Sequence, residues 1–595
     1  MICLLLAALT ALLCGCNYFK SQGEEQSSQE ESMSASDVGE ELAATYAADN
    51  IFSLNCMLGE TFNPYQITSA WNQTADMLVY EPIIEIDGNF EPQKSLVTTW
   101  TTTDGINWTF SVDTARKFHD DSNLTATDCT YSIRQAMGCS RYSARFSNIA
   151  GISPIDNTQF AVRLNKADYR FYRLLDVPCI KSGSAYESRP SGTGPYEFSK
   201  SGKSLLLDTD HPEADKMPIK RIYLKENKTA DEILQAFEDS YIDLVINNPT
   251  SMTNLGYSTA NIAKYMDTTD MHYLGYNMRS PIFGQAVFRA FMTYAVDRST
   301  IVSDCMGGAA VAATVPIHPN SSLYPKDYAD TLNYSPTSLQ NALKNIGLTD
   351  LNGDGKLDLS SGTSTATVIN FIVCSDSASK VAAARAIAKT MESAGFSVDL
   401  RELSFSDYKK ALKDGDFDIY YSEVKLCADW DLSPLFMSDG TLNYGDVQDQ
   451  YLKGYINDYL QCSDDDLPQR TATLCQYIGQ QAPITVILFE KTEVLYHRGV
   501  LGGLDPTQDN IFNNMKDWTV TLGNGTEETT EETAETPTPS PTATPTASPT
   551  PNPTAAPTAS PTPSPTATPT TTPVPTGSPA LGAAASPTEN PAAGG

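Results

Sequence analysis

Several short segments place nucleophilic, basic and acidic side chains close together in the sequence. His119-Asp120 pairs an imidazole with a carboxylate, and Ser377-Ala378-Ser379-Lys380 fits the S-x-x-K pattern of some serine hydrolases. A histidine beside a carboxylate in a loop is more often structural, and a serine at the start of a helix is an ordinary N-cap. The chain has no H-E-x-x-H, phosphate-loop or G-x-S-x-G motif. The sequence therefore does not indicate an enzyme.

A nine-residue acidic segment, Asp350–Asp358, has the spacing of a calcium-binding loop. Oxygen-bearing side chains at alternate positions, with a glycine at the sixth, are what an EF-hand-like loop uses. The oxygen ligands would be Asp350, Asn352 and Asp354, but Ser361 stands where a bidentate acid is expected. Two interpretations stay open: a structural Ca²⁺, or a plain turn. No other cofactor is expected.

The segment Leu426–Asp431 combines acidic and aromatic side chains directly after a predicted strand over Phe417–Val424. In open α/β sheets, ligands collect beyond the carboxyl ends of the strands. Asp429 could form a charge-assisted hydrogen bond there, and Trp430 could form a pocket wall. The alternatives are an aspartate that caps a turn and a tryptophan in the core.

The elements that would position these residues alternate between strand and helix. Val368–Cys374 is apolar and β-branched and predicts a buried strand. Ala378–Ala394 has helical periodicity and is stopped by Gly395, and Phe396–Leu400 returns to strand alternation. This strand–helix–strand unit predicts a parallel sheet and a mixed α/β fold.

Three further helices are predicted from the sequence. Ser335 and Pro336 fit the N-cap and first position of a helix that Gly347 ends. Phe283–Val296 is amphipathic, and Asp407–Leu412 reads as a short helix before the strand over Phe417–Val424.

The charge and the cysteines exclude some classes of partner and site. Acidic residues outnumber basic residues by 72 to 40 among 595 residues, which gives a formal net charge of −32. Nucleic acid and anionic lipid are therefore not expected as direct partners. The cysteines show no C-x-x-C pair and no cluster with histidine at metal spacing. Cys129/Cys139 and Cys462/Cys475 are possible local disulfides, with small core residues as the alternative.

The N-terminus has the features of an export signal. The apolar run Ile2–Leu13 is too short to span a bilayer. It leads into Leu13-Cys14-Gly15-Cys16, which resembles the lipobox of bacterial lipoproteins. The resemblance implies a signal peptide over residues 1–15 and lipid on Cys16. It places the protein on the extracellular face of the cell membrane, or in the periplasm of an organism with an outer membrane.

Two segments have too little apolar surface to fold. Residues 16–45 are rich in Ser, Gln and Glu and are predicted to form a flexible stalk. Residues 523–595 are almost entirely Thr, Pro, Ser and Ala after an acidic patch, and are predicted to form a disordered tail.

Five blocks in the middle of the chain occur in the order and spacing of a known family. On these blocks the chain resembles the family 5 extracellular solute-binding proteins, which serve bacterial importers driven by an ATPase. The blocks are Val79–Ile83, then Trp108–Phe110 with Lys117–Asp120 and Leu124–Asp128, then Gly192–Tyr196 (G-T-G-P-Y), Tyr276–Arg298 and Gly479–Leu488. Gly192 and Gly194 are expected to supply backbone conformations that other residues cannot adopt.

The resemblance implies a two-lobed α/β fold of the periplasmic-binding-protein type II-like class, with an additional subdomain on one lobe. Ligand would be trapped between the lobes by hinge closure and presented to the membrane permease of an ABC transporter. The protein is expected to act as a monomer. The implied division is lobe I over 46–75, 190–275 and 492–522, the additional subdomain over 76–189, and lobe II over 276–491.

The resemblance also implies a ligand. Leu426–Asp431 is similar to the family's "CADY" element, whose aspartate pairs with the α-ammonium group of a peptide; carried over, that residue is Asp429. Lys425 and Arg279 are candidates for the peptide carboxylate. The leading interpretation is peptide capture for transport, without covalent chemistry. The alternatives are a non-peptide solute (a nickel complex, haem or an oligosaccharide), or a surface receptor or adhesin that kept the fold.

Overall fold

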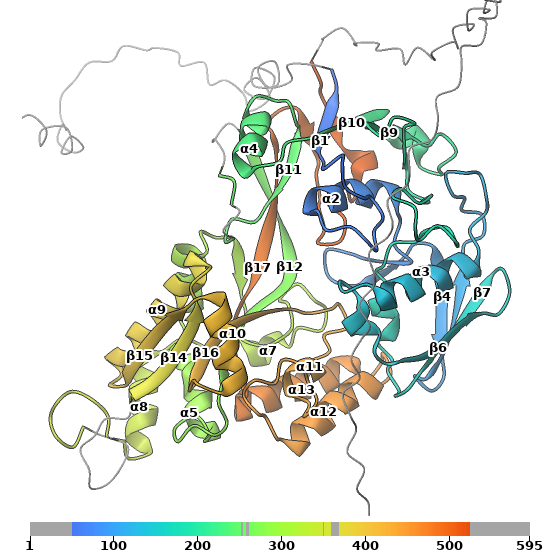
Figure 1. The fold of residues 1–595 in the computed structure, drawn as a ribbon. Coiled ribbons are helices and arrows are strands. Elements are labelled where there is room, and N and C mark those ends of the chain that lie inside the picture. The colour runs from blue at the N-terminus through green and yellow to red at the C-terminus, as the bar shows by residue number, and fades with distance from the viewer. Residues whose placement is uncertain (1–49, 252–253, 257–260, 349, 359–367, 524–595) are drawn as a thin grey trace, which may run out of the picture. The chain divides into compact units, whose positions relative to one another are not determined.

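The computed structural model of the protein describes residues 50–251, 254–256, 261–348, 350–358 and 368–523 (Figure 1). The predicted signal peptide, the predicted lipidation site Cys16 and the predicted stalk lie outside the described residues. The predicted tail lies outside them as well, from residue 524 onward. None of the helices in the described ranges has the length and apolar character needed to cross a membrane.

A mixed sheet contains the two longest strands, β12 (Asn261–Tyr276) and β17 (Ile484–His497), which pair antiparallel side by side (Figure 1). The strand order is β15-β14-β16-β12-β17-β11-β1-β10-β9-β8, with β13 paired to β17. The pair β12 and β17 therefore joins the strands on its two sides into one sheet. The other strands are β1 (Phe52–Asn55), β8 (Tyr196–Phe198), β9 (Ser204–Leu207), β10 (Arg221–Lys225), β11 (Leu244–Asn247), β13 (Ala310–Ala312), β14 (Val368–Cys374), β15 (Ser397–Leu403) and β16 (Ile419–Lys425).

The predicted strand–helix–strand unit is confirmed. β14 and β15 pair in parallel, and α9 (Ala378–Ser393) connects them. The hydroxyl of Ser377 accepts a hydrogen bond from the backbone N–H of Lys380, so this serine is the N-cap of α9. Gly395 follows the helix with a φ of 101°, in the left-handed region that favours glycine.

Two of the other helix predictions are confirmed and one is wrong. α8 (Pro336–Asn345) starts at the Ser335 cap, and α10 (Phe405–Asp414) covers the short helix before β16. The single helix expected over Phe283–Val296 is instead α5 (Ala286–Phe291) followed by a 3₁₀ turn. A preceding turn, in which Gly284 N–H donates to Ser280 O, delays the start of the helix.

A second sheet is built from residues close together in the chain. It has the order β4 (Val97–Thr102), β5 (Asn107–Val112), β7 (Gln159–Leu164) and β6 (Ile149–Pro154), all antiparallel. α3 (Ala126–Gly138) contacts β6 and β7. Trp108, Phe110 and Phe160 stack in the core of this unit. The sheet falls within residues 76–189, the range predicted for the additional subdomain, and the domain boundaries themselves stay predictions.

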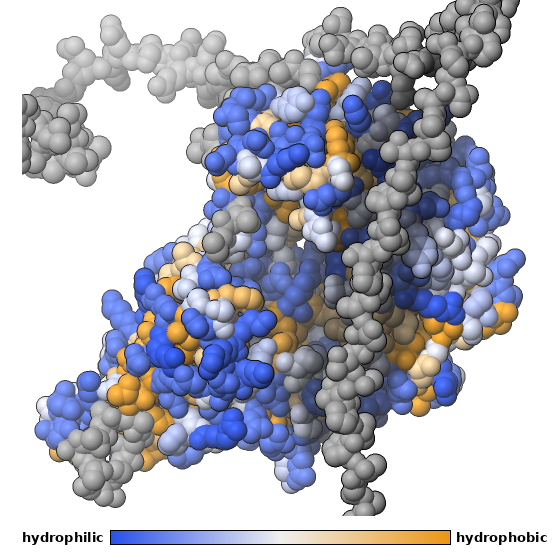
Figure 2. Space-filling view, viewed as in Figure 1, coloured by the Kyte–Doolittle hydropathy of each residue, from blue (hydrophilic) through white to orange (hydrophobic). Residues whose placement is uncertain are grey.

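The visible face of the protein is mostly hydrophilic (blue in Figure 2), in keeping with the large negative charge.

The remaining α-helices and strands complete the described chain. They are α2 (Ala70–Val79), α4 (Ala230–Glu238), α6 (Arg298–Thr300), α7 (Lys326–Ala329), α11 (Ser433–Phe436), α12 (Gln450–Gln461), α13 (Leu467–Gln481), β2 (Ile84–Ile86), β3 (Pro92–Lys94), β18 (Leu501–Gly502) and β19 (Thr519–Val520).

The G-T-G-P-Y turn needs its glycines for a different reason than expected. Neither Gly192 nor Gly194 has a positive φ. A Cβ atom on either residue would instead overlap the backbone carbonyl of Val79 at the end of α2. Gly194 N–H donates to that carbonyl at 2.9 Å. The glycines therefore allow close approach of two backbones, and the expectation of an unusual backbone conformation was wrong.

The cysteines form no disulfide among the described residues. Cys129, Cys139, Cys462 and Cys475 are all free thiols, so neither suggested local pair is bonded. Cys129 and Cys475 are fully buried in apolar clusters. The alternative interpretation, that the cysteines act as small core residues, fits these two.

Candidate functional site

A cavity of about 190 Å³ is lined by side chains from four segments that lie far apart in the chain. They come from α2 with the residues around it, from residues 141–178, from Lys425 at the end of β16, and from the loop 508–510. A second cavity, of about 520 Å³, is lined only by residues between His119 and Phe198. We take the smaller cavity as the candidate ligand site because charged groups of both signs, among them the buried Asp76, converge on it. Its ionisable lining residues are Asp76, Tyr80, Glu85, Arg141, Tyr142, Arg145, Asp176, Lys425 and Asp509.

Asp76 is the most unusual group in this cavity. It lies on the buried face of α2, which is anchored by the Ser69 cap and by Asn72. Its side chain is buried, and neither carboxylate oxygen has a hydrogen-bond partner in the described structure. Burial raises the pKa of Asp76 well above its ordinary value, opposed by the positive charge of Arg141. A buried carboxylate without a partner costs free energy that a cationic ligand group would recover.

Of the two arginines that line the cavity, one forms an ion pair and the other does not. Arg145 Nη1 lies 2.5 Å from Asp176 Oδ1, and both side chains are mostly buried. Arg141 makes no ion pair with any described residue, and its guanidinium lies over the ring of Tyr142. Burial, reinforced by the charge of Asp176, raises the pKa of Asp509 to about 6. One guanidinium and two carboxylates, those of Asp76 and Asp509, are therefore available for the opposite ends of a zwitterion.

The two basic residues predicted to bind an anionic group are in different environments. Lys425 lines the cavity. Arg279 does not line it; its side chain is 65% exposed and lies 3.9 Å from Asp446. The structure therefore brings Lys425, but not Arg279, to the cavity.

Asp429 is buried close to the cavity without lining it. Asp429 is 4% exposed. Its Oδ1 accepts from the backbone N–H of Asp431, and its backbone carbonyl accepts from the hydroxyl of Tyr459. Burial, with the charges of Asp431 and Asp168, raises its pKa well above the ordinary value, and the charge of Arg145 opposes this. Asp429 thus belongs with Asp168 and Asp431 to a group of carboxylates outside the lining of the cavity. Its role in ligand binding stays a prediction.

Trp430 is completely buried in the core. Its ring packs edge-on against Phe90 and Phe489, with centroid separations of 5.5 and 6.0 Å. Its backbone has a φ of 53°, which is rare for a bulky residue, so the turn after Cys427 is strained. The indole is not part of the cavity wall in this structure. A direct contact between Trp430 and ligand also stays a prediction.

The predicted calcium loop is an exposed turn held by its own side chains. The Asp350 carboxylate accepts from the backbone N–H groups of Gly353, Asp354 and Gly355. These bonds lower the pKa of Asp350. Asn352 Oδ1 also accepts from Asp354 N–H. Ser361 lies outside the described residues, and a calcium ion on Asp350, Asn352 and Asp354 remains a prediction.

The pair His119-Asp120 has a structural role in the described chain. The ring Nε2 of His119 forms a hydrogen bond with the carbonyl of Gly194 at 2.9 Å. The backbone N–H of His119 donates to the carbonyl of Gly192. Asp120 forms an ion pair with Lys181 and accepts from Ser122. The histidine therefore holds the G-T-G-P-Y turn.

The cavity residues Asp76, Arg141 and Asp509 were not singled out from the sequence. They lie in separate segments without a shared motif, and only folding brings them together. One signal was present: Asp76 is a lone acid in the apolar stretch before Tyr80, on the helix face that carries Asn72 and Val79. A carboxylate at a core position is the pattern that could have identified it.

Comparisons with known proteins give the family. The model of the bacterial extracellular solute-binding proteins, family 5, matches residues 91–441, more than half of the chain. The oligopeptide-binding protein AppA of Bacillus subtilis is 24% identical over 328 residues, which are 50% of this chain and 59% of AppA. The matched region thus spans about three fifths of that relative.

Solved structures show the same fold. The AppA structure, in complex with a nonapeptide, superposes with a TM-score of 0.54 at 18% identity, covering 79% of this chain and 99% of AppA. NikZ of Campylobacter jejuni, in complex with Ni(L-His), gives a TM-score of 0.57 at 17% identity, covering 79% and 99%. The predicted two-lobed α/β fold is confirmed by these neighbours. The chain belongs to the bacterial extracellular solute-binding proteins, family 5.

Proposed function

We propose that the protein captures peptides outside the cytoplasm and delivers them to the membrane permease of an ABC transporter. Membership of family 5 and the similarity to an oligopeptide-binding protein support the class of ligand. The observation that carries the proposal is the cavity in which the buried carboxylate of Asp76 has no hydrogen-bond partner and Arg141 forms no ion pair with a described residue. A peptide main chain has the matching ammonium and carboxylate groups.

The α-ammonium group has two acceptors in this proposal. Asp76 lines the cavity directly, and its carboxylate would become fully charged beside an ammonium group. Asp429, the residue implied by the family resemblance, is buried without lining the cavity, and it would reach an ammonium group only after movement of the strained turn at Trp430. Arg141 and Lys425 attract the carboxylate end. Such recognition reads the ends of a peptide and tolerates different side chains.

A nickel complex is the second candidate, because a structural neighbour binds Ni(L-His). The described lining of the cavity contains no histidine to add to such a complex, which favours a peptide. Mass spectrometry of material released from the purified protein distinguishes the two. Peptide masses support the proposal, while nickel with a small chelator, or a sugar, contradicts it.

Attachment to the membrane is a separate part of the proposal. We propose that Cys16 carries lipid, because it ends the apolar run Ile2–Leu13 and follows Gly15. The variant Cys16→Ser should move the protein from the membrane fraction to the soluble fraction of cells. Cys14→Ser is the matched control and should leave the distribution unchanged. Membrane retention of Cys16→Ser would contradict lipid attachment at this residue.

A further inference from the structure

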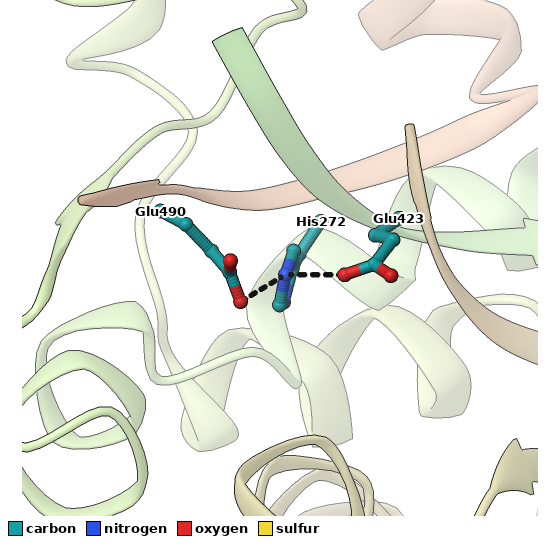
Figure 3. A group of neighbouring side chains, drawn as sticks. All are labelled: His272, Glu423 and Glu490. Carbon is teal, nitrogen blue, oxygen red and sulfur yellow. Dashed lines mark ion pairs between the residues drawn. The ribbon is translucent and has the colours of Figure 1, made fainter. Parts of the chain in front are cut away.

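Three adjacent strands place a histidine between two glutamates, none of which lines the cavity described above. His272 is on β12, Glu423 is its direct cross-strand neighbour on β16, and Glu490 is on β17 (Figure 3). His272 Nε2 lies 2.9 Å from Glu490 Oε1 and 3.4 Å from Glu423 Oε2. One donor atom from each residue falls within 4.8 Å of the others. This is the spacing of a three-ligand metal site.

The imidazole at the centre is buried and incompletely satisfied. His272 is 0% exposed, and Nδ1 lies 2.9 Å from the hydroxyl of Tyr421. Nε2 makes no hydrogen bond within the described structure, so the two nearby carboxylate oxygens lie off its N–H direction. If Nδ1–H donates to Tyr421, Nε2 carries a lone pair that is free to bind an ion. A metal-binding histidine usually donates its other N–H to a fixed partner in this way.

Each carboxylate also has a second partner. Glu490 is buried, and its Oε1 accepts from the hydroxyl of Thr250 at 2.9 Å. Glu423 is about half exposed and forms an ion pair with Lys380. Both contacts are to the oxygens that face His272, so a bound ion would share Glu490 Oε1 with Thr250 and would displace Lys380 from Glu423 Oε2. Glu423 is at the surface, where an ion can enter.

The surrounding charge favours a cation. Asp270 adds a third carboxylate near Glu423 and Glu490, and Lys425 lies close to it. With a neutral imidazole, the carboxylates of Glu423 and Glu490 and the ammonium group of Lys380 leave one net negative charge. A proton on His272 is the competing occupant, since it would neutralise the cluster without any metal.

We propose that His272, Glu423 and Glu490 bind a divalent transition metal of the Zn²⁺ class. One imidazole nitrogen and two carboxylate oxygens form a donor set that such ions accept. The ion would connect β12, β16 and β17, the strands at the centre of the mixed sheet. It would therefore stabilise the folded protein in proportion to its occupancy. This site does not depend on the peptide proposal, because none of the three ligands lines the cavity.

The experiment is a titration of the chelator-treated full chain with ZnCl₂ by isothermal calorimetry, with the melting temperature measured in parallel. One saturable site and a higher melting temperature are expected. Glu423→Gln and His272→Gln should each weaken Zn²⁺ binding by about tenfold or more. Glu423 is half exposed, so its variant is expected to fold even if His272→Gln does not.

Two matched variants control for other zinc sites. His318 is also completely buried, but it has a single carboxylate neighbour, Asp267, at 3.7 Å. Glu402 is paired with Arg385 outside the cluster. His318→Gln and Glu402→Gln should retain the wild-type affinity, as should Asp76→Asn in the peptide cavity. Absence of Zn²⁺ binding, or equal affinity in wild type and Glu423→Gln, would overturn the proposal and leave a proton on His272 as the occupant.

Discussion

The guanidinium group of Arg145 lies 2.5 Å from the carboxylate of Asp176, and the two side chains neutralise each other in the cavity wall. Arg141, four residues earlier, has no such partner among the described residues. The same cavity contains the buried, unpartnered carboxylate of Asp76. Arg145 and Asp176 are thus paired within the cavity wall, while Arg141 and the carboxylates of Asp76 and Asp509 are available to a ligand with groups of both signs.

The variant Asp76→Asn should weaken the binding of peptides with a free α-amine by about tenfold or more, because a charge-assisted hydrogen bond is lost. The ligand-free variant should also be more stable at neutral pH, by on the order of 1–3 kcal/mol, since a buried carboxylate without a partner has been removed. Asp429→Asn should weaken binding less. Calorimetry and thermal unfolding measure both effects; a larger loss in Asp429→Asn would assign the ammonium group to Asp429.

The variant Arg141→Gln should weaken the binding of peptides with a free carboxyl terminus, while affinity for the C-terminally amidated peptides should change little. The reason is that Arg141 is the cavity guanidinium without a carboxylate partner in the described structure. Arg134, which donates to the carbonyl of Ile152 outside the cavity, provides the control variant Arg134→Gln. Equal losses for both forms of the peptide would show that Arg141 does not contact the carboxylate.

Asp509 should make the stability of the ligand-free protein depend on pH. Burial raises its folded-state pKa to about 6, above the value of about 3.9 for an unfolded aspartate. Between these values the folded state binds the proton and the unfolded state does not, so this group lowers stability as pH rises from 4 to 6. Asp509→Asn should remove that contribution. Unfolding curves of the variant and the wild type that differ by the same amount at pH 4 and pH 7 would contradict it.

Calcium should stabilise the chain only if the exposed loop binds it. After chelator treatment, added CaCl₂ is expected to raise the melting temperature, and Asp354→Ala is expected to abolish the rise. Asp407→Ala, at the start of α10, is a control outside the loop. A melting temperature that does not respond to calcium would leave Asp350, Asn352 and Asp354 as parts of a plain turn.

The sequence predicts local structure better than the site. The β14–α9–β15 unit follows from periodicity and caps within one segment. The prediction of one helix over Phe283–Val296 was wrong because a turn at Gly284 interrupts an otherwise amphipathic pattern. The cavity cannot be predicted in this way. Asp76, Arg141 and Asp509 meet only after folding, so no spacing in the sequence connects them.

Trp430 illustrates a related limit. A tryptophan beside a loop aspartate suits a pocket wall and a core position equally well on sequence alone. Packing against Phe90 and Phe489 decides its position in this structure, and those residues lie 340 positions before it and 59 after it in the sequence. Long-range contacts of this kind determine the site, while short-range patterns determine the elements.

Calorimetric titration with a short peptide and its N-acetylated form tests the central claim most directly. The account predicts that the free peptide binds and that acetylation weakens the affinity by about tenfold or more, because the cationic partner of the buried carboxylates is lost. At a hundredfold excess over Kd, the free peptide should stabilise the fold by about 2.7 kcal/mol. Equal affinity for both forms, or no binding of any peptide by a protein that binds a nickel complex or a sugar, would contradict it.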